Sequence, residues 1–263
     1  MDEKNTKTED AQPCCVCGEK TKQRCGACEQ HGFDLFFCSR EHQKLIWPVH
    51  KRVCGKPSFR HPSLTFSEAA YMRRHAHEAV PLSQEGGQKK SFLEWSDHVR
   101  KREKADVWKM LEVLSDPDVL TKFKHADIEQ DLLDIRRFSS LARCPTRGAA
   151  YDTSEPFEQL ALFSHELHSS LNDLNFSTPW RSILLHKTLI FLTLNKQYHE
   201  TSMASPTSSL LAGYVATAGA SLAGVVREEV LPVSGSAAAE KVREAISHAF
   251  GVDLSAVGEK KHE

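Results

Sequence analysis

Apolar residues recur every three or four positions through much of the second half of the chain. This spacing places them on one face of an α-helix. Three such runs are Val107, Trp108, Leu111 and Leu114; Ile128, Leu132, Ile135 and Phe138; and Phe157, Leu160, Phe163, Leu167 and Leu171. Stretches that alternate apolar and polar residues, as strands do, are missing from this region. The pattern therefore predicts a mainly α-helical domain of about six helices over residues 91–251.

Local signals mark where several of these helices begin and end. Ser91 and Glu94 have the spacing of a capping box. Thr178–Pro179 is a cap followed by a first-turn proline, which predicts a helix carrying Ile183, Leu184, Leu189 and Ile190 on its apolar side. A last helix is expected from about Ala238 to near Gly251.

Residues Leu210–Val226 form a stretch of seventeen residues without charge. A membrane-spanning helix needs about 20 residues, most of them strongly apolar. This stretch is shorter and rich in glycine, alanine and serine. It predicts a buried central helix, against which other helices pack closely, rather than a membrane span.

Three further segments of the chain lack such helical periodicity. Residues 55–90 contain prolines and a Gly- and Lys-rich run, which indicate a linker, with a short helix around Glu68–Glu78. The polar residues 1–13 are expected to be disordered, and residues 252–263 to form a C-terminal tail.

Charge and composition narrow the class of protein only slightly. The 263 residues carry a formal net charge of −1, which gives no electrostatic argument for binding nucleic acid or an anionic membrane. The N-terminal residues include acidic side chains and no apolar run, so they resemble no export signal or transit peptide. We expect an intracellular protein of the cytoplasm or nucleus that binds no membrane, and the charge balance disfavours nucleic acid as its partner.

Seven of the eight cysteines lie between Cys14 and Cys54. Cys14 and Cys17 are separated by two residues, and so are Cys25 and Cys28; such tight turns aim two sulfurs at one cation. In the second half, Cys38 precedes His42 by four residues and His50 precedes Cys54 by four. This spacing puts both members of each pair on one helix face.

Two short helices are expected to carry the second half of this cluster. Ser39 is placed to cap a helix beginning at Arg40, and Pro48 to break it and open a second one. A minimal apolar core is available in the same segment, made of Phe33, Leu35, Phe36, Phe37, Ile46 and Trp47.

Six cysteines and two histidines make eight ligands, enough for two tetrahedral zinc sites. They are Cys14, Cys17, Cys25, Cys28, Cys38, His42, His50 and Cys54. Neither site keeps a position for water, so both zinc ions are expected to be structural. Cys15 is too close to Cys17 for this turn and His31 is expected to be exposed. Spacing alone leaves open whether the pairs share zinc sequentially or in an interleaved manner.

The stretch Phe37–Gln43, followed by Trp47, His50–Lys51 and Cys54, resembles a MYND-type zinc finger over residues 14–54. The HIT-type finger shares the turn spacing, but the surroundings of Trp47 favour MYND. His42 departs from the family, which usually has cysteine at that position.

The resemblance implies interleaved sites, with Cys14, Cys17, Cys38 and His42 at one zinc and Cys25, Cys28, His50 and Cys54 at the other. It also implies a protein-interaction module for short proline-rich peptides, bound by the side chains that match the family's surface, Ser39, Gln43 and Trp47.

These observations favour a zinc-binding interaction protein, an adaptor or scaffold, over an enzyme. The alternatives are a protein-lysine methyltransferase, because some MYND fingers lie within SET domains, and a nucleic-acid-associated regulator. No catalytic residues are predicted, since phosphate-loop, dinucleotide and nucleophile-elbow motifs are missing. His165 and His168 have the wrong spacing for a zinc protease, and Cys144 is interpreted as an ordinary thiol.

Overall fold

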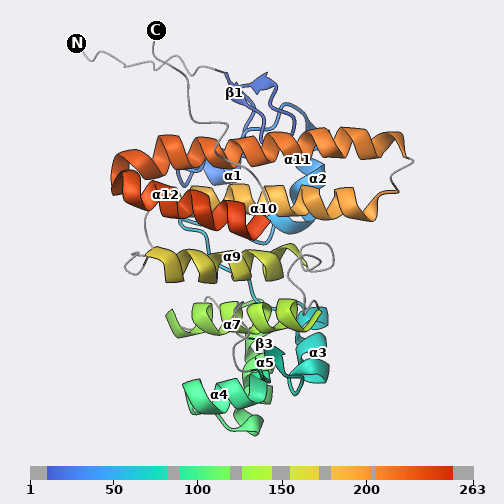
Figure 1. Cartoon of the computed structure of the whole chain (residues 1–263). Coiled ribbons are helices and arrows are strands. Elements are labelled where there is room, and N and C mark those ends of the chain that lie inside the picture. Colours follow the sequence, from blue (N-terminus) through green and yellow to red (C-terminus); the bar gives the residue numbers. More distant parts are fainter. Residues whose placement is uncertain are drawn as a thin grey trace, which may run out of the picture. The chain divides into compact units, whose positions relative to one another are not determined.

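The computed structural model describes residues 11–81, 89–118, 126–143, 155–171, 179–202 and 205–250. These residues are mainly helical (Figure 1). They divide into two compact units. Unit 1 contains Met1–Phe59 and Ser177–Val225, and unit 2 contains Arg60–Phe176 and Val226–Glu263. The sequence pattern predicted one helical domain over residues 91–251. This region is instead divided between the two units, because two of its helices pack with the N-terminal segment.

The N-terminal part of unit 1 is a small, loop-rich module. β1 (Gln12–Pro13) pairs with β2 (Lys20–Thr21) in an antiparallel manner, and the first cysteine turn lies between them. α1 (Gly26–Glu29) and α2 (Arg40–His50) follow. Since Gln12 and Pro13 belong to β1, the disordered segment predicted for residues 1–13 cannot include them. Residues 1–10 lie outside the described part of the chain.

The helix α2 differs from its prediction, because it runs through Pro48 to His50. No second helix begins at the proline; the other short helix of the module is α1. Proline has no N–H to donate to the Lys44 carbonyl, so it leaves a gap in the helical hydrogen bonds. Next to this gap, the Leu45 carbonyl accepts a hydrogen bond from the side-chain amide of Gln197 at 2.8 Å. An external donor thus supports the helix near its proline.

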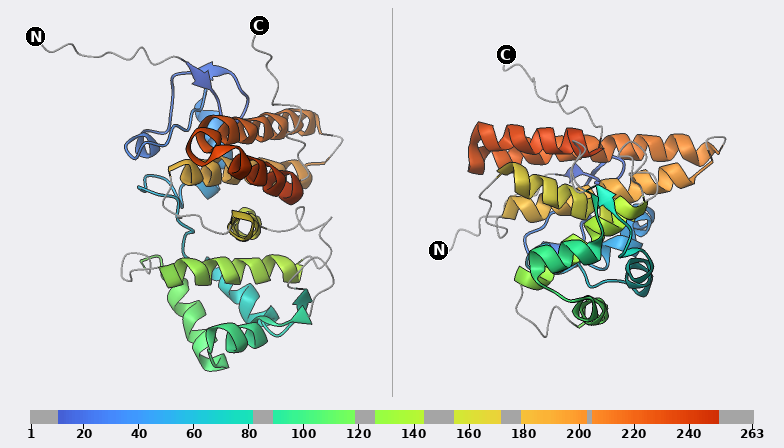
Figure 2. Two further views of the ribbon diagram at one scale, coloured as in Figure 1. Left: turned by 60° about the vertical axis from the view of Figure 1, so that its left-hand side comes forward. Right: turned by 60° about the horizontal axis from the view of Figure 1, so that its bottom comes forward.

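α10 (Pro179–Glu200) and α11 (Pro206–Val225) complete unit 1 and lie side by side (Figures 1 and 2). More than half of α10 is buried. In α11 only one face is buried, and Leu210 on the other side is 53% exposed. The prediction that residues 210–226 form the buried central helix was therefore wrong. The exposed face of this uncharged stretch carries small residues such as Ala216, which can face solvent without a charged side chain.

By length and composition, one helical stretch of the described chain could cross a membrane. It covers Pro206–Phe250 and has a mean hydropathy of 1.6 in its most apolar window, 39% of which is buried. Core helices of soluble proteins meet the same criteria, so this is weak evidence for a membrane span.

Unit 2 is built almost entirely from helices. In chain order its elements are α3 (Phe66–His75), β3 (Val80–Pro81), β4 (Lys89–Lys90), α4 (Phe92–Arg100), α5 (Lys104–Leu114), α7 (Ala126–Arg143), α9 (Pro156–Leu171), the π-helical turn η1 (Val226–Val230) and α12 (Leu231–Phe250). α7 packs against α3 and α9, and α9 packs against α12. A core of apolar side chains from α3, α4, α5 and α7 includes Met72, Phe92, Leu111, Leu132 and Ile135.

The predicted helical runs and the capping box are confirmed. The Glu94 N–H donates to Ser91 Oγ at 3.2 Å, and the Ser91 N–H donates to the Glu94 carboxylate at 2.8 Å. α12 reaches Phe250, the last described residue before the expected end near Gly251, but it begins at Leu231 and is interrupted at Gly235, whose φ is +80°. Within residues 91–251, seven α-helices are described where about six were expected. Thr178 and the C-terminal tail lie outside the described residues.

Residues 55–90 are not a linker over most of their described length. α3 begins with a second capping box, formed by Thr65 and Glu68, which was not predicted. Ala69 and Met72 of this helix are buried in the unit 2 core. Glu68 also receives a hydrogen bond from the buried Arg136 at 2.7 Å. The short helix expected near Glu68–Glu78 is therefore present as α3, but it is part of the unit 2 core rather than of a linker.

Candidate metal centre

Four donors from three places in the N-terminal module meet at metal site 1. Cys14 and Cys17 lie on the turn after β1, Cys38 precedes α2, and His42 lies in its first turn. The Cys38 and Cys17 sulfurs are 3.4 Å apart. His42 Nδ1 lies 3.0 Å from the Cys38 sulfur and 3.8 Å from that of Cys14. His42 therefore faces the site with Nδ1.

The first turn of site 1 depends on a glycine. Gly18 has φ of +78°, a conformation that side chains with a Cβ rarely adopt, and its N–H donates to the Cys14 carbonyl at 3.0 Å. The Val16 N–H points at the Cys14 sulfur at 3.5 Å. The local sequence thus folds the chain back so that Cys14 and Cys17 converge.

Metal site 2 takes its donors from α1, the end of α2 and the following turn. Cys25 precedes α1, Cys28 lies within it, His50 is the last residue of α2, and Cys54 follows. His50 Nε2 lies 3.4 Å from the Cys25 sulfur and 3.6 Å from that of Cys28. The Cys54 sulfur is 3.4 Å from Cys25 and 3.8 Å from Cys28. His50 thus faces site 2 with Nε2.

The pairing that spacing left open is therefore interleaved, as the family resemblance implied. Within each site all four donor atoms lie within 4.8 Å of one another. Zinc bond lengths of about 2.0–2.3 Å place a sulfur and a second tetrahedral donor about 3.5–3.8 Å apart. The separations given above lie near this range, except for the shorter 3.0 Å between His42 Nδ1 and the Cys38 sulfur. Each site has three sulfurs and one imidazole, and this donor set fits structural zinc.

Hydrogen bonds and burial shift the pKa values of the ligand thiols in opposite directions. Hydrogen bonds from Cys28 and then His50 lower the pKa of Cys25 to about 3. The pKa of Cys28 is raised, first by its hydrogen bond to Cys25 and then by burial. Burial raises the pKa of Cys54 to about 11, and it also raises the pKa of Cys38. Thiols with a raised pKa keep their protons at neutral pH. Zinc displaces these protons when it binds, so binding at neutral pH releases protons.

Two residues near the cluster were predicted not to be ligands. Cys15 is buried, its N–H donates to the Phe36 carbonyl at 2.8 Å, and it belongs to neither donor set. His31 is exposed, as expected.

The predicted peptide surface lies along one side of α2. Ser39, Gln43 and Trp47 are spaced four residues apart, so they share a helix face. The Ser39 hydroxyl caps α2 by accepting a hydrogen bond from the His42 N–H at 3.2 Å. Gln43 is half-buried. Trp47, which was predicted both for the minimal core and for the peptide surface, is 43% exposed.

Sequence reasoning missed residues of α10 and α11 that contact the metal ligands. The hydroxyl of Tyr214 lies 2.8 Å from His42 Nε2. The ring of His186, which is buried, lies 6.0 Å from the ring of His50. Burial lowers the pKa of His186 to about 3, so this imidazole is neutral at physiological pH. No local signal could have identified these residues, because they lie more than 130 positions from the ligands they contact.

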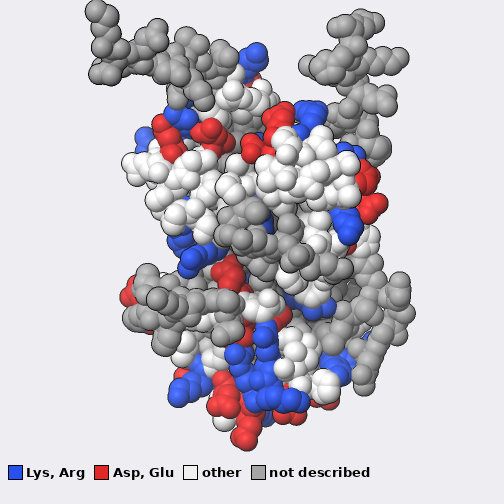
Figure 3. Space-filling view, turned by 90° about the vertical axis from the view of Figure 1, so that its left-hand side faces the viewer, with Lys and Arg blue, Asp and Glu red and all other residues white. Residues whose placement is uncertain are grey.

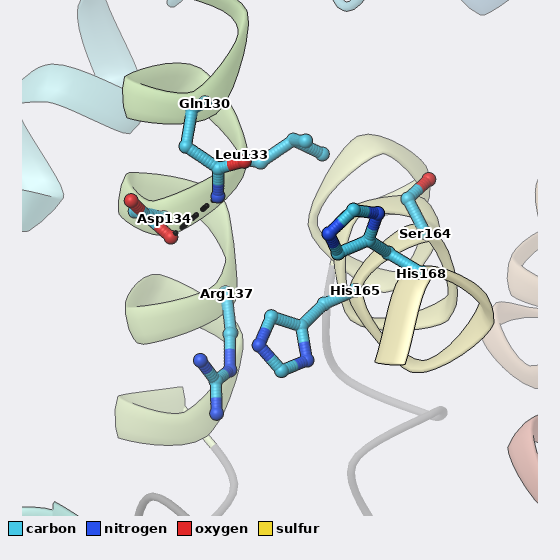
Figure 4. Close-up of a pocket in the computed structure, with 7 residues that line it drawn as sticks. All are labelled: Gln130, Leu133, Asp134, Arg137, Ser164, His165 and His168. Carbon is cyan, nitrogen blue, oxygen red and sulfur yellow. Dashed lines mark hydrogen bonds between the residues drawn. The ribbon is translucent and has the colours of Figure 1, made fainter. Parts of the chain in front are cut away.

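A small pocket in unit 2 lies between α7 and α9 (Figure 4). It contains His165 and His168 beside Arg137 and Asp134. Burial, followed by the nearby Arg137 charge, lowers the pKa of His165 to about 4. Asp134 accepts hydrogen bonds from Gln130 at 3.1 Å and from an arginine of α4 at 2.8 Å. The Asp134 carboxylate is therefore engaged in structural contacts. Cys144, which was interpreted as an ordinary thiol, lies outside the described residues.

Comparison with known proteins gives matches to the metal-binding module. The MYND finger family profile matches residues 14–54. Dauer abnormal formation protein 25 of Caenorhabditis elegans is 48% identical over 43 residues, which cover 16% of this chain and 10% of the relative. No solved structure matches the chain. The matched segment contains both donor clusters, so residues 14–54 of this chain are a MYND finger that carries two structural zinc sites.

Proposed function

We propose that this protein is an adaptor or scaffold whose finger binds a short proline-rich peptide of a partner protein. MYND fingers are zinc-binding protein-interaction modules, which supports a protein partner. In this proposal the peptide lies on the surface formed by Ser39, Gln43 and Trp47. The two zinc ions have a structural role, and the protein is not an enzyme.

The exposure of Trp47 is the observation that supports this proposal most directly. Phe33, Leu35, Phe37 and Ile46 of the finger are buried, whereas Trp47 is 43% exposed on α2. An exposed indole can pack against proline rings, which are fixed in an extended conformation at little entropic cost. Gln43, one turn away, can donate to and accept from an extended peptide backbone. The Ser39 oxygen already caps α2, so this hydroxyl would add a donor at most.

The test is titration of the zinc-loaded full chain with a panel of proline-rich peptides and their Pro→Ala counterparts. Binding is measured by calorimetry and by the shifts of the finger's NMR resonances. Trp47→Ala is expected to weaken binding about 30-fold or more, the effect of losing a central aromatic anchor of at least about 2 kcal/mol. Zinc content should stay at two ions per chain.

Phe66→Ala is the matched control, because Phe66 of α3 is an aromatic residue that is 87% exposed and lies outside the finger. This variant should bind the peptides as the parent does. Peptide affinity that survives Trp47→Ala, or that falls equally in Phe66→Ala, would disprove the proposed surface.

The two alternatives gain no support. The matches found lie over the finger and do not extend to a methyltransferase domain. Calorimetry with S-adenosylmethionine would test that alternative directly. For nucleic acid, Figure 3 shows Lys and Arg mixed with Asp and Glu around α4 and α5. There Arg100 pairs with Asp134 and Arg102 pairs with Asp131. Such mixed charge is typical of a solvated protein surface rather than a phosphate-binding one.

The compartment is also part of the proposal. Zinc sites with three thiolates need reduced cysteines, which persist in the cytosol and nucleus. We therefore place the protein inside the cell, in one of these two compartments.

A further inference from the structure

The ligand His42 has a hydrogen-bonding partner on a helix far away in the sequence. Tyr214 of α11 places its hydroxyl 2.8 Å from His42 Nε2. The two rings meet edge to face, with centroids 5.1 Å apart and planes at 83°. Both residues belong to unit 1.

The donor geometry of site 1 assigns a role to each nitrogen of His42. Nδ1 faces the sulfurs of Cys38 and Cys14, at 3.0 and 3.8 Å. When Nδ1 binds zinc, the proton of the neutral imidazole resides on Nε2. The Nε2–H then donates to the Tyr214 oxygen. A cysteine at position 42, the residue usual in this family, would offer no second donor for such a bond.

A partner of this kind fixes the orientation and tautomer of a metal-bound imidazole. Removing it typically weakens metal binding by about 10- to 100-fold. At site 2 the imidazole of His50 lies instead among the rings of Phe37, Trp47 and His186. The hydroxyl contact is thus a feature of site 1.

Further contacts place α11 and α10 against the same part of the finger. A Cβ built on Gly18 would lie 3.2 Å from the Thr217 methyl group, so α11 passes close to the first cysteine turn. Thr217 is three residues after Tyr214, on the same helix face. On α10, Gln197 donates to the Leu45 carbonyl of α2. These contacts place α10 and α11 beside the part of the finger that contains His42.

We propose that Tyr214 is a positioning residue for zinc site 1, and that the packing of α11 on the finger and zinc binding at this site are energetically coupled. In this protein the finger is completed by a helix that begins more than 150 residues after it. The coupling passes through one hydrogen bond, from His42 Nε2 to the Tyr214 oxygen.

The test is a double-mutant cycle on the full chain, with zinc affinity measured by competition with a chelator. Tyr214→Phe keeps the ring and removes the oxygen. It is expected to lower the affinity for one of the two zinc ions about 10-fold. In a His42→Cys background the same substitution should change affinity less than about 2-fold, because cysteine has no Nε2–H. Tyr198→Phe on α10 is the matched control and should leave both affinities unchanged.

Two outcomes of the cycle would overturn the proposal. No loss of affinity in Tyr214→Phe would show that the hydroxyl does not support the ligand. An equal loss in both backgrounds would mean that the oxygen acts on helix packing and not through His42.

Ring-nitrogen NMR of the zinc-loaded parent gives a second, independent readout that does not depend on how His42→Cys folds. Nδ1 of His42 is expected to be the metal-bound nitrogen, with a proton on Nε2 that exchanges faster with solvent in Tyr214→Phe. Coordination through Nε2, or an exchange rate that the substitution leaves unchanged, would refute the assignment.

Discussion

At the scale of single residues, the chemistry of the ligands was predictable because it is local. A tight turn brings Cys14 and Cys17 together whatever surrounds it, and the same holds for Cys25 and Cys28. Choosing Cys14 over its neighbour Cys15 required only the geometry of that turn. The sequence left open whether Trp47 lies in the core or on the peptide surface, because whether an aromatic side chain is covered depends on what packs over α2.

Replacing the two adjacent cysteines separately tests the ligand assignment. Cys15→Ala is expected to keep two zinc ions per chain, because this side chain is buried outside both donor sets. Cys14→Ala should lose the ion of site 1, which would be left with three donors. Elemental analysis of protein purified without added zinc measures both. Loss of an ion in Cys15→Ala, with two retained in Cys14→Ala, would reverse the assignment.

At the scale of elements, periodicity located the helices of unit 2 well. The capping box at Ser91 also predicted where α4 begins. The short helix α3 was expected, but its segment was interpreted as a linker because the short apolar face is flanked by prolines and basic residues. Its place in the core depends on partners distant in sequence. Glu68 pairs with Arg136, which is fully buried on α7 and also donates to the Ser63 carbonyl at 3.2 Å.

This buried ion pair predicts a large effect on stability. Arg136→Met leaves the Glu68 carboxylate buried without its cation, which should lower the free energy of unfolding by about 3–5 kcal/mol. Arg73→Met is the matched change at an exposed pair with Glu112, where a loss of about 0–1 kcal/mol is expected. Urea unfolding followed by circular dichroism compares the two. Equal, small losses would show that α3 is not anchored through this pair.

At the scale of the whole molecule, the compact unit that contains the finger extends beyond the finger itself. α10 and α11 belong to the same compact unit as the finger, although they begin more than 120 residues later. The intervening helices form the larger part of unit 2. Since metal binding supplies much of the folding free energy of so small a module, the helices packed on it should depend on the metal too.

Removal of zinc with a chelator should therefore have an effect beyond the finger. Backbone amides of α10 and α11 are expected to lose protection from hydrogen exchange, whereas those of α7 in unit 2 should change less. Hydrogen-exchange mass spectrometry of the loaded and stripped full chain measures this difference. If α10 and α11 keep their protection without zinc, their stability is independent of the finger.

The sequence by itself determined the eight ligands, the zinc chemistry and the positions of most helices. These features depend on residue type and on spacing within a few positions, which one chain segment specifies alone. Only the tertiary structure decided the zinc pairing from geometry, the exposure of Trp47, the burial of Arg136 and the contact between Tyr214 and His42. Each of these joins segments far apart in sequence, and such contacts arise from packing over the whole unit, which leaves no local pattern.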